Sequence, residues 1–181
     1  MSGHNGIDVA VPVVGFVAPS GTGKTTLLEQ VIVLLTERGV RTGLIKHTHH
    51  RFDIDRPGKD SHRLREAGAR QVMVGSRKRW ALITERDSES EEPDLAELLA
   101  AMDPARLDLI LVEGFKHEAF PKVELHRPAL GKPPLFREDG DIIAVATDAP
   151  EGLDCPLPLL DLNDPAAVCD FLLDRFGPGT G

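Results

Sequence analysis

Residues 13–26 read VVGFVAPSGTGKTT, a run that contains a complete passage from strand to turn to helix. Its first half belongs to an apolar stretch that begins at Val9, as is typical of a strand buried on both faces of a parallel sheet. Pro12 lacks the N–H that a sheet needs, so we expect the strand to begin after it. The second half is a glycine-rich turn, followed at once by an amphipathic helix over residues 24–38. This order predicts the start of a βαβ unit with a right-handed crossover.

Residues 18–25 have the spacing of a phosphate-binding loop. The general pattern is G-x-x-x-x-G-K-[ST], and here it reads APSGTGKT, with alanine in place of the first glycine. Two glycines allow the backbone to fold so that successive N–H groups point at phosphate oxygens, next to the positive end of the helix. We expect Lys24 to reach the β- and γ-phosphates and the Thr25 hydroxyl to bind Mg²⁺. The predicted phosphate site comprises Ser20, Gly21, Thr22, Gly23, Lys24, Thr25 and Thr26.

A carboxylate near the metal is expected from the apolar strand over residues 107–112, which has Asp108 near one end and Glu113 at the other. Ligands of open α/β sheets bind outside the carboxyl ends of the strands, which favours Glu113. Glu113 is therefore the predicted catalytic residue and second metal ligand, holding Mg²⁺ through a water or orienting the attacking water. Lys116, three residues further on, is predicted to face the same phosphates.

The rest of the chain continues the alternation of strands and helices. A hairpin is predicted for residues 71–75 and 80–84, and a strand half exposed to water for residues 122–127. The fold class is therefore α/β: a three-layer P-loop NTPase fold with a mostly parallel sheet, helices on both faces and a β-hairpin extension. We predict a single domain over residues 1–181, with flexible ends at 1–11 and 177–181. Further strands are predicted at residues 43–46 and 142–146, and further helices at 60–67, 94–102 and 164–176.

Composition limits the possible partners. The chain has 29 acidic and 21 basic side chains and a net charge of -8, which argues against nucleic acid or an anionic membrane as the main partner. Cys155 and Cys169 have no CxxC spacing and are expected to be small core residues. The first residues lack the pattern of a secretory signal, and no apolar run is long enough to span a bilayer, so a cytoplasmic location is expected.

Several stretches of the chain together resemble a known family, molybdopterin-guanine dinucleotide biosynthesis protein B (MobB). They occur in the family's order and span most of the chain, and the alanine at position 18 is also what this family tends to have. The stretches are SGTGKTTLL at 20–28, GLIKHTHH at 43–50, PGKDS at 57–61, RWAL at 79–82 and LILVEGFKH at 109–117.

The resemblance implies a GTP-binding, weakly hydrolysing accessory protein, usually a homodimer. Its partners would be the guanylyltransferase that joins GMP to molybdopterin and the proteins that carry molybdopterin. The Asn-Lys-x-Asp signature for guanine is absent, so another carboxylate must accept from the base. We favour Asp148, at the carboxyl end of an apolar strand, with Asp161 and Asp164 as alternatives.

Two other functions remain open at this stage. A small-molecule P-loop kinase could use the basic residues Arg77, Lys78 and Arg79 as part of a lid, although a solvated hairpin tip explains them as well. A metal-insertion GTPase could use residues 47–50, which read HTHH, together with a nearby aspartate. Adjacent side chains on an extended segment point to opposite sides, so a loop that contacts phosphate or a partner is favoured over a metal site.

Trp80 is expected to pack in the core.

Overall fold

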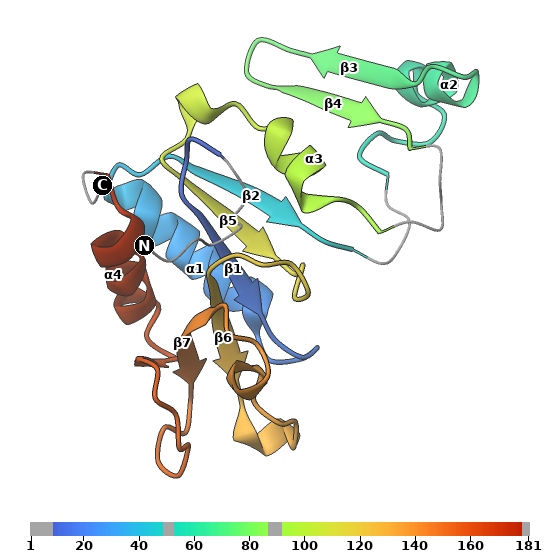
Figure 1. Ribbon diagram of the computed structural model, residues 1–181. Coiled ribbons are helices and arrows are strands. Elements are labelled where there is room, and N and C mark those ends of the chain that lie inside the picture. The colour runs from blue at the N-terminus through green and yellow to red at the C-terminus, as the bar shows by residue number, and fades with distance from the viewer. Residues whose placement is uncertain (1–8, 49–52, 87–91, 179–181) are drawn as a thin grey trace. The chain divides into compact units, whose positions relative to one another are not determined.

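The computed structural model describes residues 9–48, 53–86 and 92–178 of the chain (Figure 1). The chain divides into two compact units, one formed by residues 1–47 and 94–181 and the other by residues 48–93. No helix in the described ranges is long and apolar enough to cross a membrane.

The larger unit is built on a six-stranded sheet in which every neighbouring pair is parallel. This confirms the predicted α/β class with a mostly parallel sheet. The prediction missed only the shortest strand, which has three residues and follows a proline. Across the sheet the order is β2 (Thr42–Lys46), β5 (Leu109–Glu113), β1 (Val13–Val17), β6 (Lys122–His126), β7 (Ile142–Thr147) and β8 (Leu159–Asp161).

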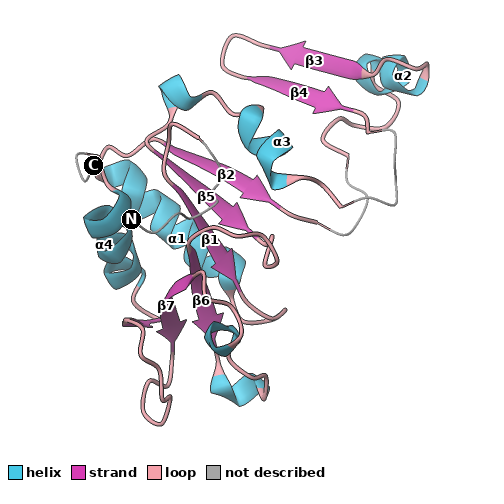
Figure 2. Ribbon diagram, in the orientation of Figure 1, coloured by secondary structure: helices cyan, strands magenta, loops and turns pink. Residues whose placement is uncertain are grey.

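Helices cover both faces of this sheet, which gives the three layers (Figure 2). Because successive strand residues point to opposite faces, β1 contributes Val14 and Phe16 to one core and Val13 to the other. The first core lies beneath α1 (Lys24–Glu37) and α4 (Pro165–Phe176), and the second beneath α3 (Leu95–Ala100).

Side-chain caps determine where two of these helices begin, as predicted. Asp94 accepts a hydrogen bond from the Ala96 N–H at the start of α3. Asp164 does the same for two N–H groups of α4, whose first residue is Pro165. A proline suits this first position because its missing N–H would have had no partner within the helix.

Cys169 of α4 is fully buried, as expected, and Cys155 is partly buried.

The strand β6 does not match the prediction of a half-exposed strand, because all 5 of its residues are buried. Lys122, Glu124 and His126 alternate along it and are 1%, 0% and 5% exposed. Glu124 accepts hydrogen bonds from the N–H groups of Leu135 and Phe136 at 2.7 and 2.8 Å. Burial raises the pKa of this carboxyl. The polar alternation therefore marks a strand face covered by polar loops, and not a face open to water.

The loop predicted over residues 127–140 contains two short 3₁₀ helices, and a third precedes β5. All three have a single turn, as expected for this helix type. They are Pro104–Arg106, Pro128–Leu130 and Leu135–Arg137.

The smaller unit contains α2 (Asp60–Glu66) and the antiparallel strands β3 (Gln71–Gly75) and β4 (Trp80–Thr84). Both strands of the predicted hairpin are confirmed at the predicted residues. The turn between them is closed by a hydrogen bond from the Ser76 N–H to the Arg79 carbonyl, at 2.8 Å.

Trp80 does not pack in a core: it is 55% exposed. Exposure alternates along β4, and Trp80 lies on the same side as Leu82, which is also exposed. A two-stranded sheet has no second layer of its own to cover both faces, so one row of apolar side chains stays at the surface.

Asp108 stabilises the fold at the amino end of β5, the end opposite to Glu113. Its carboxylate accepts from the Arg41 backbone N–H at 2.8 Å, and from Nε and Nη2 of the same residue at 2.9 and 2.6 Å. The Arg41 contacts lower the pKa of Asp108 to about 2. Asp108 and Glu113 thus lie at the two ends of β5, and Asp108 is used in contacts within the fold.

We expect Asp108→Asn to lower the free energy of unfolding at pH 7, since an amide cannot form the same paired contacts with a guanidinium. A carboxyl with a lowered pKa in the folded state contributes stability above its ordinary pKa of about 3.9, and loses it as the pH falls. The difference between wild type and variant should therefore shrink from about pH 4 towards pH 2, where the folded-state pKa of Asp108 lies. Urea unfolding at several pH values measures this, and an equal difference at every pH would contradict it.

Candidate nucleotide-binding site

The predicted phosphate loop connects the carboxyl end of β1 to the first residue of α1. Gly21 and Gly23 have φ angles of 83° and 96°, in the left-handed region that glycine adopts without strain. Thr22 between them is 1% exposed, and its hydroxyl donates to the Pro19 carbonyl at 2.7 Å. The loop is therefore held in a tight turn by its own side chain, with the glycines where the turn requires them.

The start of α1 is suited to an anion. Gly23 is the N-cap residue, and no described side chain accepts a hydrogen bond there as a cap. The first N–H groups of a helix have no partner within it and carry the positive end of the helix dipole. Lys24, Thr25 and Thr26 provide these N–H groups, and the two threonines are exposed. This arrangement can bind phosphate oxygens.

The strand order brings Glu113 next to the loop. Glu113 is the last residue of β5 and lies opposite Phe16 of β1 on one side and Lys46 of β2 on the other. Its carboxylate is 4.0 Å from Lys24 Nζ and 3.3 Å from Lys46 Nζ. The two predicted residues, Lys24 and Glu113, are thus brought together from positions far apart in the chain.

Lys46 was not identified from the sequence as a site residue. It ends a short strand, but nothing in the sequence shows that this strand lies beside β5. Only the parallel pairing of β2 with β5 places its ammonium at the Glu113 carboxylate. The pair leaves Glu113 11% exposed between two cations.

The turn after Glu113 has an unusual backbone. Gly114 has a φ of 100°, and Phe115 has a φ of 53°, which is uncommon for a residue other than glycine. The Phe115 ring is stacked on the His47 ring, with centroids 4.7 Å apart, and Phe115 is only 6% exposed. Burial and stacking therefore hold a strained conformation that directs the chain away from the end of β5, a feature common at functional sites.

Lys116 lies on the loop that follows this turn, and its side chain is exposed. Its backbone carbonyl accepts a hydrogen bond from Lys122 Nζ at 3.3 Å, and the Glu118 carbonyl accepts another at 2.7 Å. Lys122 also pairs with Asp139 at 2.8 Å. A buried lysine on β6 thus fixes the backbone of the Lys116 loop, while the Lys116 side chain points to the surface.

Asp148 also lies at this edge of the sheet, directly after β7, and it is paired with a residue that the sequence did not single out. Arg127, directly after β6, donates from Nη1 to Asp148 Oδ2 at 2.5 Å and from Nε to the Thr22 carbonyl at 2.8 Å. The alternatives have local partners: Asp161 accepts from the Asn163 N–H, and Asp164 caps α4. Arg127 had no sequence signal beyond a basic residue at the end of a predicted strand.

The residues that suggested a metal site are only partly described, because His49 and His50 lie outside the described residues. His47 stacks on Phe115, and its backbone N–H donates to the Glu113 carbonyl at 2.9 Å. Within the described ranges, no three side chains of the types His, Cys, Asp and Glu are grouped to hold a metal ion.

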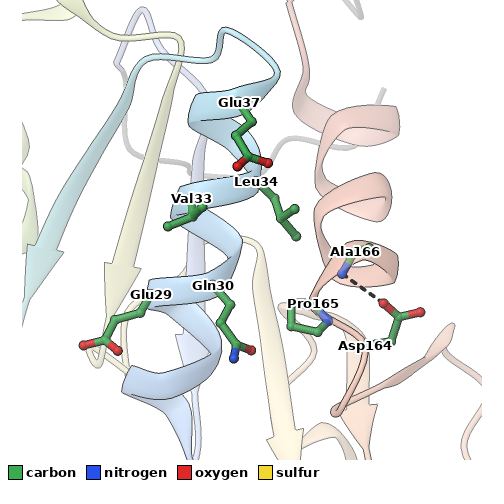
Figure 3. A pocket seen from close by; sticks show the side chains of 8 residues that line it. All are labelled: Glu29, Gln30, Val33, Leu34, Glu37, Asp164, Pro165 and Ala166. Atoms are coloured by element: carbon green, nitrogen blue, oxygen red, sulfur yellow. Dashed lines mark hydrogen bonds between the residues drawn. The ribbon is translucent and has the colours of Figure 1, made fainter.

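A surface groove of about 390 Å³ lies between α1 and the first turn of α4 (Figure 3). It shares no residue with the phosphate loop, and three of its lining side chains are the carboxylates Glu29, Glu37 and Asp164. Figure 3 shows the side chain of Leu34 pointing towards α4 and Asp164 engaged in its cap. Negative charge disfavours phosphate, so the groove is not an alternative nucleotide site.

The fold and the loop define the class of protein: an α/β protein with a P-loop at the carboxyl edge of a parallel sheet. A family model matches residues 13–148 of the chain and describes "MobB: Molybdopterin guanine dinucleotide synthesis protein B". The chain belongs to the MobB family.

Relatives and solved structures agree with this assignment. The molybdopterin-guanine dinucleotide biosynthesis adapter protein of Escherichia coli is 53% identical and covers 91% of this chain and 93% of its own. The adapter protein of Haemophilus influenzae is 43% identical over 90% of this chain and 88% of its own. A crystal structure of Bacillus subtilis MobB superimposes with a TM-score of 0.71 at 27% identity, covering 91% of this chain and 98% of that one.

We expect Lys24→Ala to weaken binding of a nucleoside triphosphate by roughly tenfold to a hundredfold, because a charge-assisted hydrogen bond to phosphate is lost. Its effect on the melting temperature should be small, since the Lys24 ammonium is 4.0 Å from its nearest acidic partner, beyond hydrogen-bond distance. Calorimetric titration of both proteins measures the change. Lys132→Ala, which removes an exposed lysine outside the site, is the matched control. Equal affinity of wild type and Lys24→Ala would exclude Lys24 from the site.

Proposed function

We propose that this protein is a GTP-binding accessory protein of molybdenum cofactor biosynthesis, with weak Mg²⁺-dependent GTPase activity, which assists the guanylyltransferase that makes molybdopterin guanine dinucleotide. The observation that carries the proposal is the meeting of Lys24 on the P-loop with Glu113 at the end of β5. The relatives are named as adapter proteins of molybdopterin-guanine dinucleotide biosynthesis, and these names support a role of this chain in the same pathway. We propose a cytoplasmic location.

Magnesium fits the residues at this edge. Mg²⁺ prefers oxygen ligands, and the Thr25 hydroxyl and the Glu113 carboxylate are oxygen donors on the two elements that meet there. Bound Mg²⁺ would neutralise charge on the β- and γ-phosphates. Glu113 would hold the ion or orient the attacking water, while Lys24 binds the phosphates. Lys116, on the loop fixed by Lys122, is proposed as a further phosphate contact.

The proposed partners are the guanylyltransferase, molybdopterin-carrying proteins and a second copy of this chain. Exposed apolar side chains on the β3–β4 hairpin support a role in protein contact, because groups of large apolar side chains at a surface are usually covered in an assembly. They are Met73, Val74, Trp80 and Leu82, between 39% and 64% exposed. Neither nucleic acid nor a membrane is proposed as a partner, given the net charge of -8.

We expect Glu113→Gln to weaken Mg²⁺-dependent GTP binding or hydrolysis while leaving metal-free binding unchanged or stronger. The carboxylate contributes charge to a magnesium site that an amide lacks. In the absence of metal the same carboxylate lies beside Lys24 and Lys46, so its removal leaves more positive charge for the phosphates. Titrations with Mg²⁺ and with a chelator measure the two cases. An equal loss in both would place the metal elsewhere.

We propose that Asp148 reads the base, and that Asp148→Asn lowers the ratio of GTP to ATP affinity by roughly tenfold to a hundredfold. A carboxylate accepts from both guanine donors, whereas an amide offers one acceptor and one clashing donor. XTP, which has a carbonyl in place of the guanine amino group, should lose less affinity for the variant than GTP does. Competition binding of GTP, ATP and XTP to wild type and variant measures this. The ratio cancels any common effect on the phosphates, and Asp174→Asn, which changes an exposed aspartate on α4, is the matched control. An unchanged ratio would assign base reading to other groups.

A further inference from the structure

Arg127 contacts the backbone of the phosphate loop. Its Nε donates to the Thr22 carbonyl at 2.8 Å. A Cβ atom placed on Gly23 would lie 3.8 Å from its Nη2, so the guanidinium also lies against the next residue of the loop. The side chain is 31% exposed. Arg127 therefore contacts the loop through backbone groups that every P-loop has.

The direction of this hydrogen bond has a consequence for the anion site. In a trans peptide the C=O and the following N–H point in opposite directions. Because the Thr22 carbonyl points to Arg127, the Gly23 N–H is directed to the other side of the loop. A loop that binds an anion needs its N–H groups on one side and its carbonyls on the other. Holding the Thr22 carbonyl outward thus prepares the Gly23 N–H for a phosphate oxygen.

Asp148 completes this arrangement by holding Arg127 in place. Its Oδ2 accepts from Nη1 at 2.5 Å, while Nε of the same guanidinium is used for the loop. The two donors belong to one planar group, so the position of the carboxylate fixes the angle at which Nε meets the carbonyl. A lysine ammonium has the charge but not this planar pair of donors.

We propose that Arg127 is a positioning residue that preorganises the phosphate loop, and that Asp148 anchors it. This inference rests on the proposed nucleotide binding at the loop. It assigns Asp148 a role at the phosphates, which is separate from reading the base. It also links the base side of the site to the phosphate side through one side chain.

The test compares GTP with pyrophosphate, which has no base, by calorimetry on four variants of the full chain: Arg127→Gln, Arg127→Lys, Asp148→Ala and the control Arg175→Gln. Arg175 lies in the last turn of α4 and is exposed, so its loss removes one positive charge away from the loop. Melting temperatures show that each variant is folded. The amide resonance of Gly23 reports directly on the orientation of the loop.

We expect Arg127→Gln and Arg127→Lys to weaken both ligands about tenfold, the size of one lost hydrogen bond of this kind. Asp148→Ala should weaken pyrophosphate about threefold, since the arginine remains but is not anchored. Arg175→Gln should bind as the wild type does. The Gly23 amide resonance should move in both Arg127 variants before any ligand is added.

Distinct results would overturn the inference. If Arg127→Lys binds pyrophosphate as the wild type does, Arg127 acts only by charge and not by positioning the loop. If Asp148→Ala weakens GTP but leaves pyrophosphate unchanged, Asp148 reads the base and does not anchor Arg127. A wild type that binds neither GTP nor pyrophosphate would instead reject the proposed function on which the inference rests.

Discussion

The parallel pairing of β5 between β2 and β1 brings three strand ends to one edge of the sheet. Glu113 lies opposite Phe16 in one neighbouring strand and opposite Lys46 in the other. The phosphate loop begins directly after β1, so the same pairing brings Lys24 to 4.0 Å from Glu113. With another strand order these groups would lie at separate places. The site therefore depends on backbone pairing before it depends on any side chain.

Three basic side chains and two carboxylates, Glu113 and Asp148, meet near the phosphate loop of this acidic protein. The chain has a net charge of -8, yet Lys24 and Lys46 both point to Glu113, and Arg127 lies against the loop. Electrostatic fields in salt solution decay over roughly 10 Å, so an anion at the loop responds to these nearby cations more than to distant acids. The carboxylates of the α1–α4 groove lie apart from the loop. Net charge alone thus says little about whether this protein can bind a phosphate.

The loops around the site are held by buried charges. Lys122 is 1% exposed and donates to two carbonyls of the loop that carries Lys116. Glu124 is fully buried and accepts from the N–H groups of Leu135 and Phe136, which lie between β6 and β7. Burying a charge is costly unless its hydrogen bonds are satisfied, and here they are satisfied by backbone groups that would otherwise lack partners. The strained turn at Phe115 is held in the same way, by burial and by the His47 ring. The backbone near the site is therefore determined in advance of any ligand.

Local patterns in the sequence determined the P-loop at residues 18–25, the hairpin strands and the caps Asp94 and Asp164, because each depends only on residues a few positions apart. They also predicted that Glu113 lies at the end of its strand next to the P-loop, since the end of a strand at which ligands bind can be read from its direction. Only the tertiary structure decided that Lys46 joins Glu113 and that Arg127 reaches Thr22, 105 positions away. It also decided that β6 is covered on both faces and that Trp80 is not covered. These features depend on which strands are neighbours and on what lies over each face, and neither is encoded by spacing along the chain.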